Sequence, residues 1–77
     1  MQTIIKASKI SKGQSGIIRK IEGDITFVAR LREMGFGESM TITKVSDNAH
    51  RNIIINLKGT KIWLTEGAAE CILVELL

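Results

Sequence analysis

A chain of 77 residues can bury one hydrophobic core and is too short for a second, so we expect a single domain over residues 1–77. Its apolar fraction of 44% excludes a disordered chain, and no apolar run approaches the roughly 20 residues that span a bilayer. The net charge of +3 permits contact with an anionic partner without demanding it, and the single cysteine excludes an internal disulfide.

The first residues of the chain lack the apolar region and the small-residue cleavage site of a signal peptide. A lone cysteine also fits a reducing compartment. We therefore expect a soluble, cytoplasmic protein that does not insert directly into a membrane.

The first third of the chain leads into a helix. Residues 3–12 predict an irregular or short extended segment, residues 13–16 a glycine-rich turn, and residues 17–21 a strand whose imperfect alternation indicates a bulge. Asp24 is placed to cap a helix and Gly35 to end it. Between them Phe27, Val28, Leu31 and Met34 fall on one face, which predicts an amphipathic helix lying on a sheet.

The remainder of the chain predicts strands. Residues 40–45, 53–57, 60–64 and 71–77 are rich in β-branched and aliphatic residues, and residues 46–52 form a polar loop. The two-residue turn at Lys58 and Gly59 sets the register of a hairpin in which Ile54 lies opposite Trp63. Thr65 can cap a single helical turn over residues 66–69. Five short antiparallel strands avoid open edges best by curling, so we expect a mainly β fold: a small five-stranded SH3-like barrel with one inserted α-helix and a short helical turn before the last strand.

These residues resemble a known family. The similarity covers about residues 10–75 and is carried by a set of glycines and aliphatic residues in a fixed order: Gly13, Gly16, Ile18, Ile21, Gly23, Asp24, Arg30, Leu31, Met34, Gly35, Phe36, Gly59, Leu64, Ala69, Ile72 and Val74. In this order they resemble the ferrous iron transport protein A family. The chain departs from the family pattern at two places. Glu38 and Ser39 replace a usual Pro-Gly turn, so we expect that turn to close differently, through Gly37. Trp63 replaces a small or aliphatic residue.

The resemblance implies a small cytoplasmic accessory protein with an SH3-like barrel. Proteins of this family act with the large permease that imports ferrous iron and carries its own cytoplasmic GTP-binding domain. The same module also forms the C-terminal domain of iron-dependent repressors, where it contributes metal ligands in some cases. The alternative implied by the resemblance is therefore a stand-alone relative of that repressor domain that binds a divalent transition metal.

The residues themselves offer little reactive chemistry. His50 lies in the polar loop and Cys71 at the start of the last strand, so they do not suggest a nucleophile with its base, and we expect no enzyme. They are also the weak candidates for a metal site, since no ligand pair has zinc-like spacing. The residues indicate no definite cofactor. A weak site for a divalent transition metal, completed by a second subunit of a homo-oligomer, remains an alternative.

Binding of a protein partner has more support. Ile54 and Trp63 lie off the core face of the hairpin, where the helix either covers them or leaves them exposed, and the same alternatives hold for Met34 and Phe36. Arg30, beside the apolar stripe, could pair with an acidic partner segment. One tryptophan among a few lysines is a poor platform for stacking bases, so no nucleic acid is expected.

Overall fold

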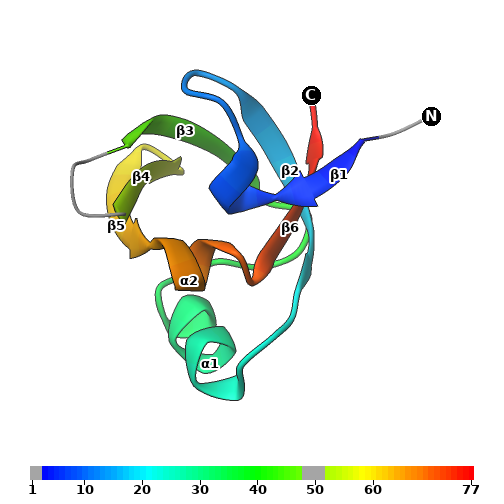
Figure 1. The fold of residues 1–77 in the computed structure, drawn as a ribbon, viewed down its shortest axis with the longest axis vertical. Coiled ribbons are helices and arrows are strands. Elements are labelled where there is room, and N and C mark those ends of the chain that lie inside the picture. The colour runs from blue at the N-terminus through cyan, green and yellow to red at the C-terminus, as the bar shows by residue number, and fades with distance from the viewer. Residues whose placement is uncertain (1–2, 48–51) are drawn as a thin grey trace.

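The computed structural model describes residues 3–47 and 52–77. The elements in chain order are β1 (Ile4–Lys6), the 3-10 helix η1 (Ala7–Lys9), β2 (Ser15–Ile21), α1 (Ile25–Glu33), β3 (Thr41–Asp47), β4 (Asn52–Leu57), β5 (Thr60–Thr65), α2 (Glu66–Ala69) and β6 (Ile72–Leu76). The described strands form one curled antiparallel sheet in the order β1-β6-β2-β3-β4-β5, so that β1 and β5 are its two edges (Figure 1).

The sheet has six strands in the described residues where the sequence predicts five. The additional strand is β1, which lies in the lead-in and pairs with β6, Ile5 opposite Val74. Three residues are too few for an alternating pattern, so only the pairing with β6 defines them as a strand. The predicted bulge in β2 is confirmed, because the register against β6 shifts between Ile18 and Lys20.

The β4–β5 hairpin has the predicted register throughout, from Leu57 opposite Thr60 to Ile53 opposite Leu64. Lys58 and Gly59 both adopt positive φ, 52° and 86°, as a tight type I′ turn requires. The Gly59 N–H also donates to Asn56 Oδ1 at 2.9 Å. The turn therefore determines which hairpin side chains enter the core.

The core lies inside the curled sheet. Its largest fully buried side chains come from the strands, from α1 and from the residue that follows η1. They are Ile10, Ile18, Leu31, Ile42, Ile55, Leu64, Ile72 and Val74. On the face of the hairpin opposite Ile54 and Trp63, the side chains of Ile53, Ile55, Leu57 and Leu64 are buried in the core, whereas Ile62 is only half-buried.

Helix α1 begins and ends where the sequence predicts. Asp24 Oδ1 accepts from the Thr26 N–H at 2.8 Å. At the other end Gly35 has φ +102°, its N–H donates to the Arg32 carbonyl and the Phe36 N–H to the Leu31 carbonyl, both at 3.1 Å. This pair of bonds is a Schellman motif, in which the residue after the glycine packs back onto the helix.

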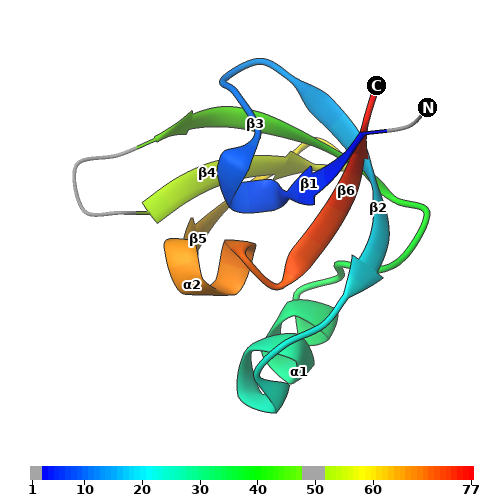
Figure 2. The ribbon, with the colours of Figure 1, turned by 45° about the vertical axis from the view of Figure 1, so that its right-hand side comes forward.

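The helix does not lie across the sheet as expected. Figures 1 and 2 place it next to α2, at the end of the barrel where β5 ends, and α1 contacts α2. Only Leu31 of the apolar stripe is fully buried, while Phe27 and Met34 remain 39% and 41% exposed. A nine-residue helix that packs at the end of a small barrel covers too little of it to bury its whole apolar face.

The turn before β3 differs from the expectation. Ser39, not Gly37, takes the left-handed conformation, with φ 70°. The Met40 N–H donates to the Gly37 carbonyl at 3.4 Å, and the Ser39 N–H donates to the Ile18 carbonyl of β2 at 2.7 Å. The bond to β2 holds a serine where the family pattern has a glycine.

No helix in residues 3–47 and 52–77 has the length and apolar character needed to cross a membrane.

Candidate partner-binding surface

A groove between α1 and β5 is the principal candidate site. It has a volume of about 180 Å³, and we call it the α1–β5 groove; it is lined by Phe27, Arg30, Met34, Trp63, Leu64, Thr65 and Ala68. Phe27 and Met34 are seven residues apart and therefore share one helix face. Trp63 is 59% exposed, because its position in β5 directs it away from the core, whereas the neighbouring Leu64 is buried. Three large apolar side chains thus meet at one exposed place.

Phe27 packs against α2 at Gly67. A Cβ on Gly67 would lie 3.6 Å from Phe27 Cζ, so the ring rests on the α2 backbone. Thr65 Oγ1 caps α2 by accepting from the Ala68 N–H at 3.3 Å, as predicted. The short α2 helix therefore supports one wall of the groove.

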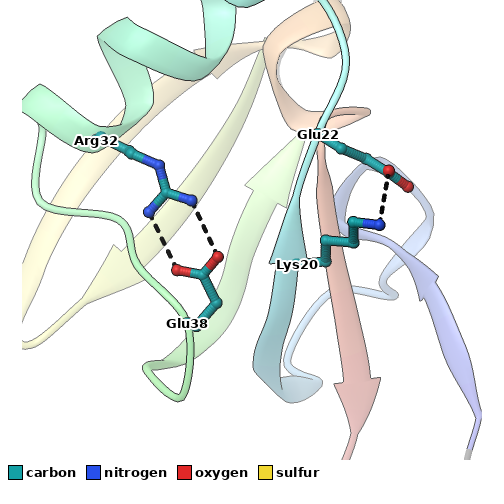
Figure 3. A network of polar contacts seen from close by, with 4 residues as sticks. All are labelled: Lys20, Glu22, Arg32 and Glu38. Atoms are coloured by element: carbon teal, nitrogen blue, oxygen red, sulfur yellow. Dashed lines mark hydrogen bonds and ion pairs between the residues drawn. The ribbon is translucent and has the colours of Figure 1, made fainter.

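The two arginines that flank the helix stripe have different environments. Arg32 makes a bidentate pair with Glu38, with Nη1 to Oε1 at 3.0 Å and Nη2 to Oε2 at 2.9 Å, and the bond lowers the pKa of Glu38 to about 2 (Figure 3). Figure 3 also shows the separate pair between Lys20 and Glu22, at 3.2 Å. Arg30 lines the groove and makes no ion pair with another described residue. Its guanidinium is therefore available to an acidic partner.

A second groove, of about 260 Å³, continues along the other half of β5. We call it the turn groove; it is lined by Met34, Gly35, Met40, Leu57, Lys58, Thr60 and Ile62. Met34 lines both grooves and separates them. The two grooves together follow β5 from its first residue to its last.

The residues predicted to bind a partner do not all lie at the α1–β5 groove. The structure brings Arg30, Met34 and Trp63 together at the α1–β5 groove. Ile54 lies opposite Trp63 in the hairpin and is half-buried, outside the groove lining. Phe36 is only 2% exposed, because the Schellman motif folds it onto Leu31, so its assignment to a partner surface was wrong.

Sequence reasoning missed Phe27 as a member of the site. It was placed in the apolar stripe, and periodicity alone cannot tell which members of a stripe the rest of the fold leaves uncovered. Its proximity to Gly67 depends on how α1 packs against α2. The available signal was the shortness of the two predicted helices, which have nine and four residues in the structure and are too short to cover a whole apolar face.

The predicted metal candidates are not brought into a recognisable centre. Cys71 is buried just before β6, and its Sγ lies 3.6 Å from the Gly67 carbonyl, to which the thiol donates. A Cβ on Gly23 would lie 2.9 Å from that Sγ, so the thiol fills the space beside the Gly23 backbone. His50 lies outside the described residues, and within the described ranges no three His, Cys, Asp or Glu side chains gather as a metal site would need.

Comparisons with known proteins place this geometry in a family. The model of the FeoA domain matches residues 5–76. The chain is also similar to solved structures. One is an iron uptake regulatory protein, FeoA, with 25% identity, a TM-score of 0.85, and coverage of 97% of this chain and 99% of that one. No match was found among curated proteins.

Two further structures share the fold. One is the zinc-complexed FeoA of Stenotrophomonas maltophilia, a prokaryotic SH3 domain protein considered as a bacterial ferrous iron transport activating factor; it has 18% identity, a TM-score of 0.76, and coverage of 96% of this chain and 88% of that one. The other is a manganese-dependent transcriptional repressor, with 17% identity, a TM-score of 0.89, and coverage of 96% of this chain but only 37% of that one. The SH3-like fold predicted from the sequence is confirmed. Because the family model covers nearly the whole chain, this protein belongs to the FeoA domain family, whose SH3-like members are linked to ferrous iron transport.

Proposed function

We propose that this protein is a non-enzymatic accessory and regulatory protein of ferrous iron transport that docks on the cytoplasmic part of the GTP-binding iron permease. Family membership supports the link to ferrous iron transport. The main observation in support of docking at this surface is the exposed cluster of Phe27, Met34 and Trp63 around the α1–β5 groove. Exposed apolar clusters with a charged rim are typical of partner sites.

The free energy available at this surface is large for so small a protein. A tryptophan side chain offers on the order of 200 Å² of surface. With 59% of Trp63 exposed, about 120 Å² remains to be covered, which corresponds to about 3 kcal/mol at about 25 cal/mol per Å². Phe27 and Met34 add to this, and Arg30 supplies a cation at the rim. We therefore assign Trp63 as the central contact.

A docked protein without a reactive centre acts on a transporter through its preference among the transporter's conformations. A protein that binds two conformations equally well shifts neither. We infer that the α1–β5 groove contacts an apolar segment of the permease that is presented in one conformational state, with acidic residues near Arg30. We propose that the protein acts in the cytoplasm, as a single domain over residues 1–77.

Calorimetry with the soluble cytoplasmic domain of the permease tests this proposal. We expect saturable binding by the wild-type chain and a loss of affinity of about thirtyfold for Trp63→Ala, the size typical of a central aromatic contact. The matched control is Ile4→Ala, which truncates another exposed apolar side chain on β1, away from α1. Absence of binding at tens of micromolar protein and low salt, or equal losses for the two variants, would refute the proposal.

The alternative is a metal-binding relative of the repressor domain. Its support is the shared fold with the manganese-dependent repressor, which at 17% identity extends to the fold alone. Titration with ferrous or zinc ions separates the two proposals by NMR. Only the alternative predicts stoichiometric, saturable shifts of Cys71 and His50 resonances.

A further inference from the structure

Strand β5 is an unpaired edge of the sheet, and the hairpin turn determines which of its backbone groups are free. Leu57 and Thr60 close the two-residue turn, so they form a hydrogen-bonded pair, and such pairs alternate along an antiparallel ladder. The backbone groups of Thr60, Ile62 and Leu64 therefore face β4. The N–H and C=O groups of Lys61 and Trp63, and the N–H of Thr65, point away from it, and no other described element donates to or accepts from them.

The grooves open along this edge. Trp63, Leu64 and Thr65 are consecutive, so their side chains point alternately to the two faces of the sheet. All three line the α1–β5 groove, which therefore opens at the edge of β5 and not on one face. Thr60 and Ile62 line the turn groove in the same way, further along the strand. Side chains two positions apart on a strand lie roughly 7 Å from each other, so one strand added to β5 delivers alternate side chains into the two grooves.

Charge distinguishes the possible occupants of the edge. The hairpin, residues 52–65, contains Lys58 and Lys61 and no acidic residue, and Arg30 lies across the groove. The nearest acidic residues in sequence are Asp47 at the end of β3 and Glu66 in the first turn of α2, while Glu33 follows Arg30 by three residues in α1. Two copies of this chain paired through β5 would bring two basic hairpins together, whereas an acidic partner segment would be attracted.

We propose that the permease binds by adding an extended segment as an extra strand to the free edge of β5, with apolar side chains at alternate positions in the two grooves and acidic residues facing Lys58, Lys61 and Arg30. This inference rests on the proposed function and adds the binding mode. Backbone hydrogen bonds to Lys61, Trp63 and Thr65 give affinity, and the two grooves give specificity.

A proline at position 61 tests the proposal, with Lys61→Ala as the matched control. The Lys61 N–H is outside the β4–β5 ladder, so Lys61→Pro keeps the hairpin while it removes a donor and fills the edge with its ring. Both variants lose the same charge. We expect Lys61→Pro to bind the permease's cytoplasmic domain at least about tenfold more weakly than Lys61→Ala. Equal binding by the two variants overturns strand addition and leaves the proposed function intact, whereas failure of the wild-type chain to bind overturns both.

Amide hydrogen exchange on the wild-type chain gives an independent readout, which also decides the matter if Lys61→Pro does not fold. In the free chain, the amides of Ile62 and Leu64 should exchange slowly and those of Lys61, Trp63 and Thr65 quickly. In the complex all five should exchange slowly. A complex that leaves the three outward amides fast overturns the proposal, and so does their protection in the free chain at high protein concentration, which would indicate pairing between two copies.

Discussion

Replacing Ser39 with glycine should stabilise this protein. Ser39 has φ 70°, in the left-handed region, and it is held there by the bond from its N–H to the Ile18 carbonyl at 2.7 Å. Its neighbour Glu38 is fixed by the bidentate pair with Arg32. The turn therefore keeps its shape when the side chain is removed, and glycine relieves the steric cost of that shape.

The size of the effect is a difference of two terms. The left-handed conformation costs a residue with a Cβ about 1–2 kcal/mol, and glycine loses about 0.5–1 kcal/mol more conformational entropy on folding. The net gain for Ser39→Gly is then about 0.5–1 kcal/mol. For a domain of 77 residues this corresponds to a rise in Tm of about 2–8 °C.

Thermal unfolding followed by circular dichroism or calorimetry measures this change. Ser11→Gly is the matched control, because Ser11 is exposed in a loop with negative φ, so the same substitution there should lower the Tm. Ser39→Ala keeps the Cβ and should leave the Tm nearly unchanged. A Tm for Ser39→Gly at or below that of the wild type would refute the assignment of strain to this turn.

Three further outcomes follow from other contacts. The pKa of Glu38 in the folded chain, about 2, lies below its ordinary value of 4.5, so the stabilisation from its pair with Arg32 is present above pH 4.5 and is lost as the pH falls through 2. NMR titration should show the pKa of Glu38 raised toward its ordinary value in Arg32→Gln. Gly23→Ala places a Cβ 2.9 Å from Cys71 Sγ and imposes φ +133° on a residue with a side chain, so it should lower the free energy of unfolding by about 1–3 kcal/mol. In a double-mutant cycle measured by urea unfolding, Cys71→Ala should recover only part of this loss, because it relieves the contact but not the backbone strain. Leu31→Ala removes the one fully buried side chain of α1 and should cost about 2–5 kcal/mol in the same assay, against less than 1 kcal/mol for Ile25→Ala, since Ile25 is exposed.

The parts of the fold that depend on local geometry could be predicted from the sequence. Asp24 and Gly35 bound the helix because capping is decided by a few adjacent residues. The turn at Lys58 and Gly59 determines the whole hairpin register, and with it the exposure of Trp63. In both cases the deciding contacts lie within a few residues of each other in the chain.

The parts that depend on packing between distant segments could not be predicted. Strand β1 exists through its pairing with β6, almost 70 residues later, as in Ile5 opposite Val74. Phe36 and Phe27 exchange their expected roles: the Schellman motif buries Phe36, and the position of α1 against α2 leaves Phe27 at the groove. The predicted site was therefore located on the correct helix and strand, with one wrong and one missing aromatic residue.

The surface assignment is tested most directly by chemical-shift mapping of the isotope-labelled chain against the permease's cytoplasmic domain. We expect the largest changes at Phe27, Met34 and the Trp63 indole N–H, with further changes at the amides of Lys61 and Thr65. Changes confined to β1 and η1, or none at a concentration where the domain is saturated, would contradict this assignment.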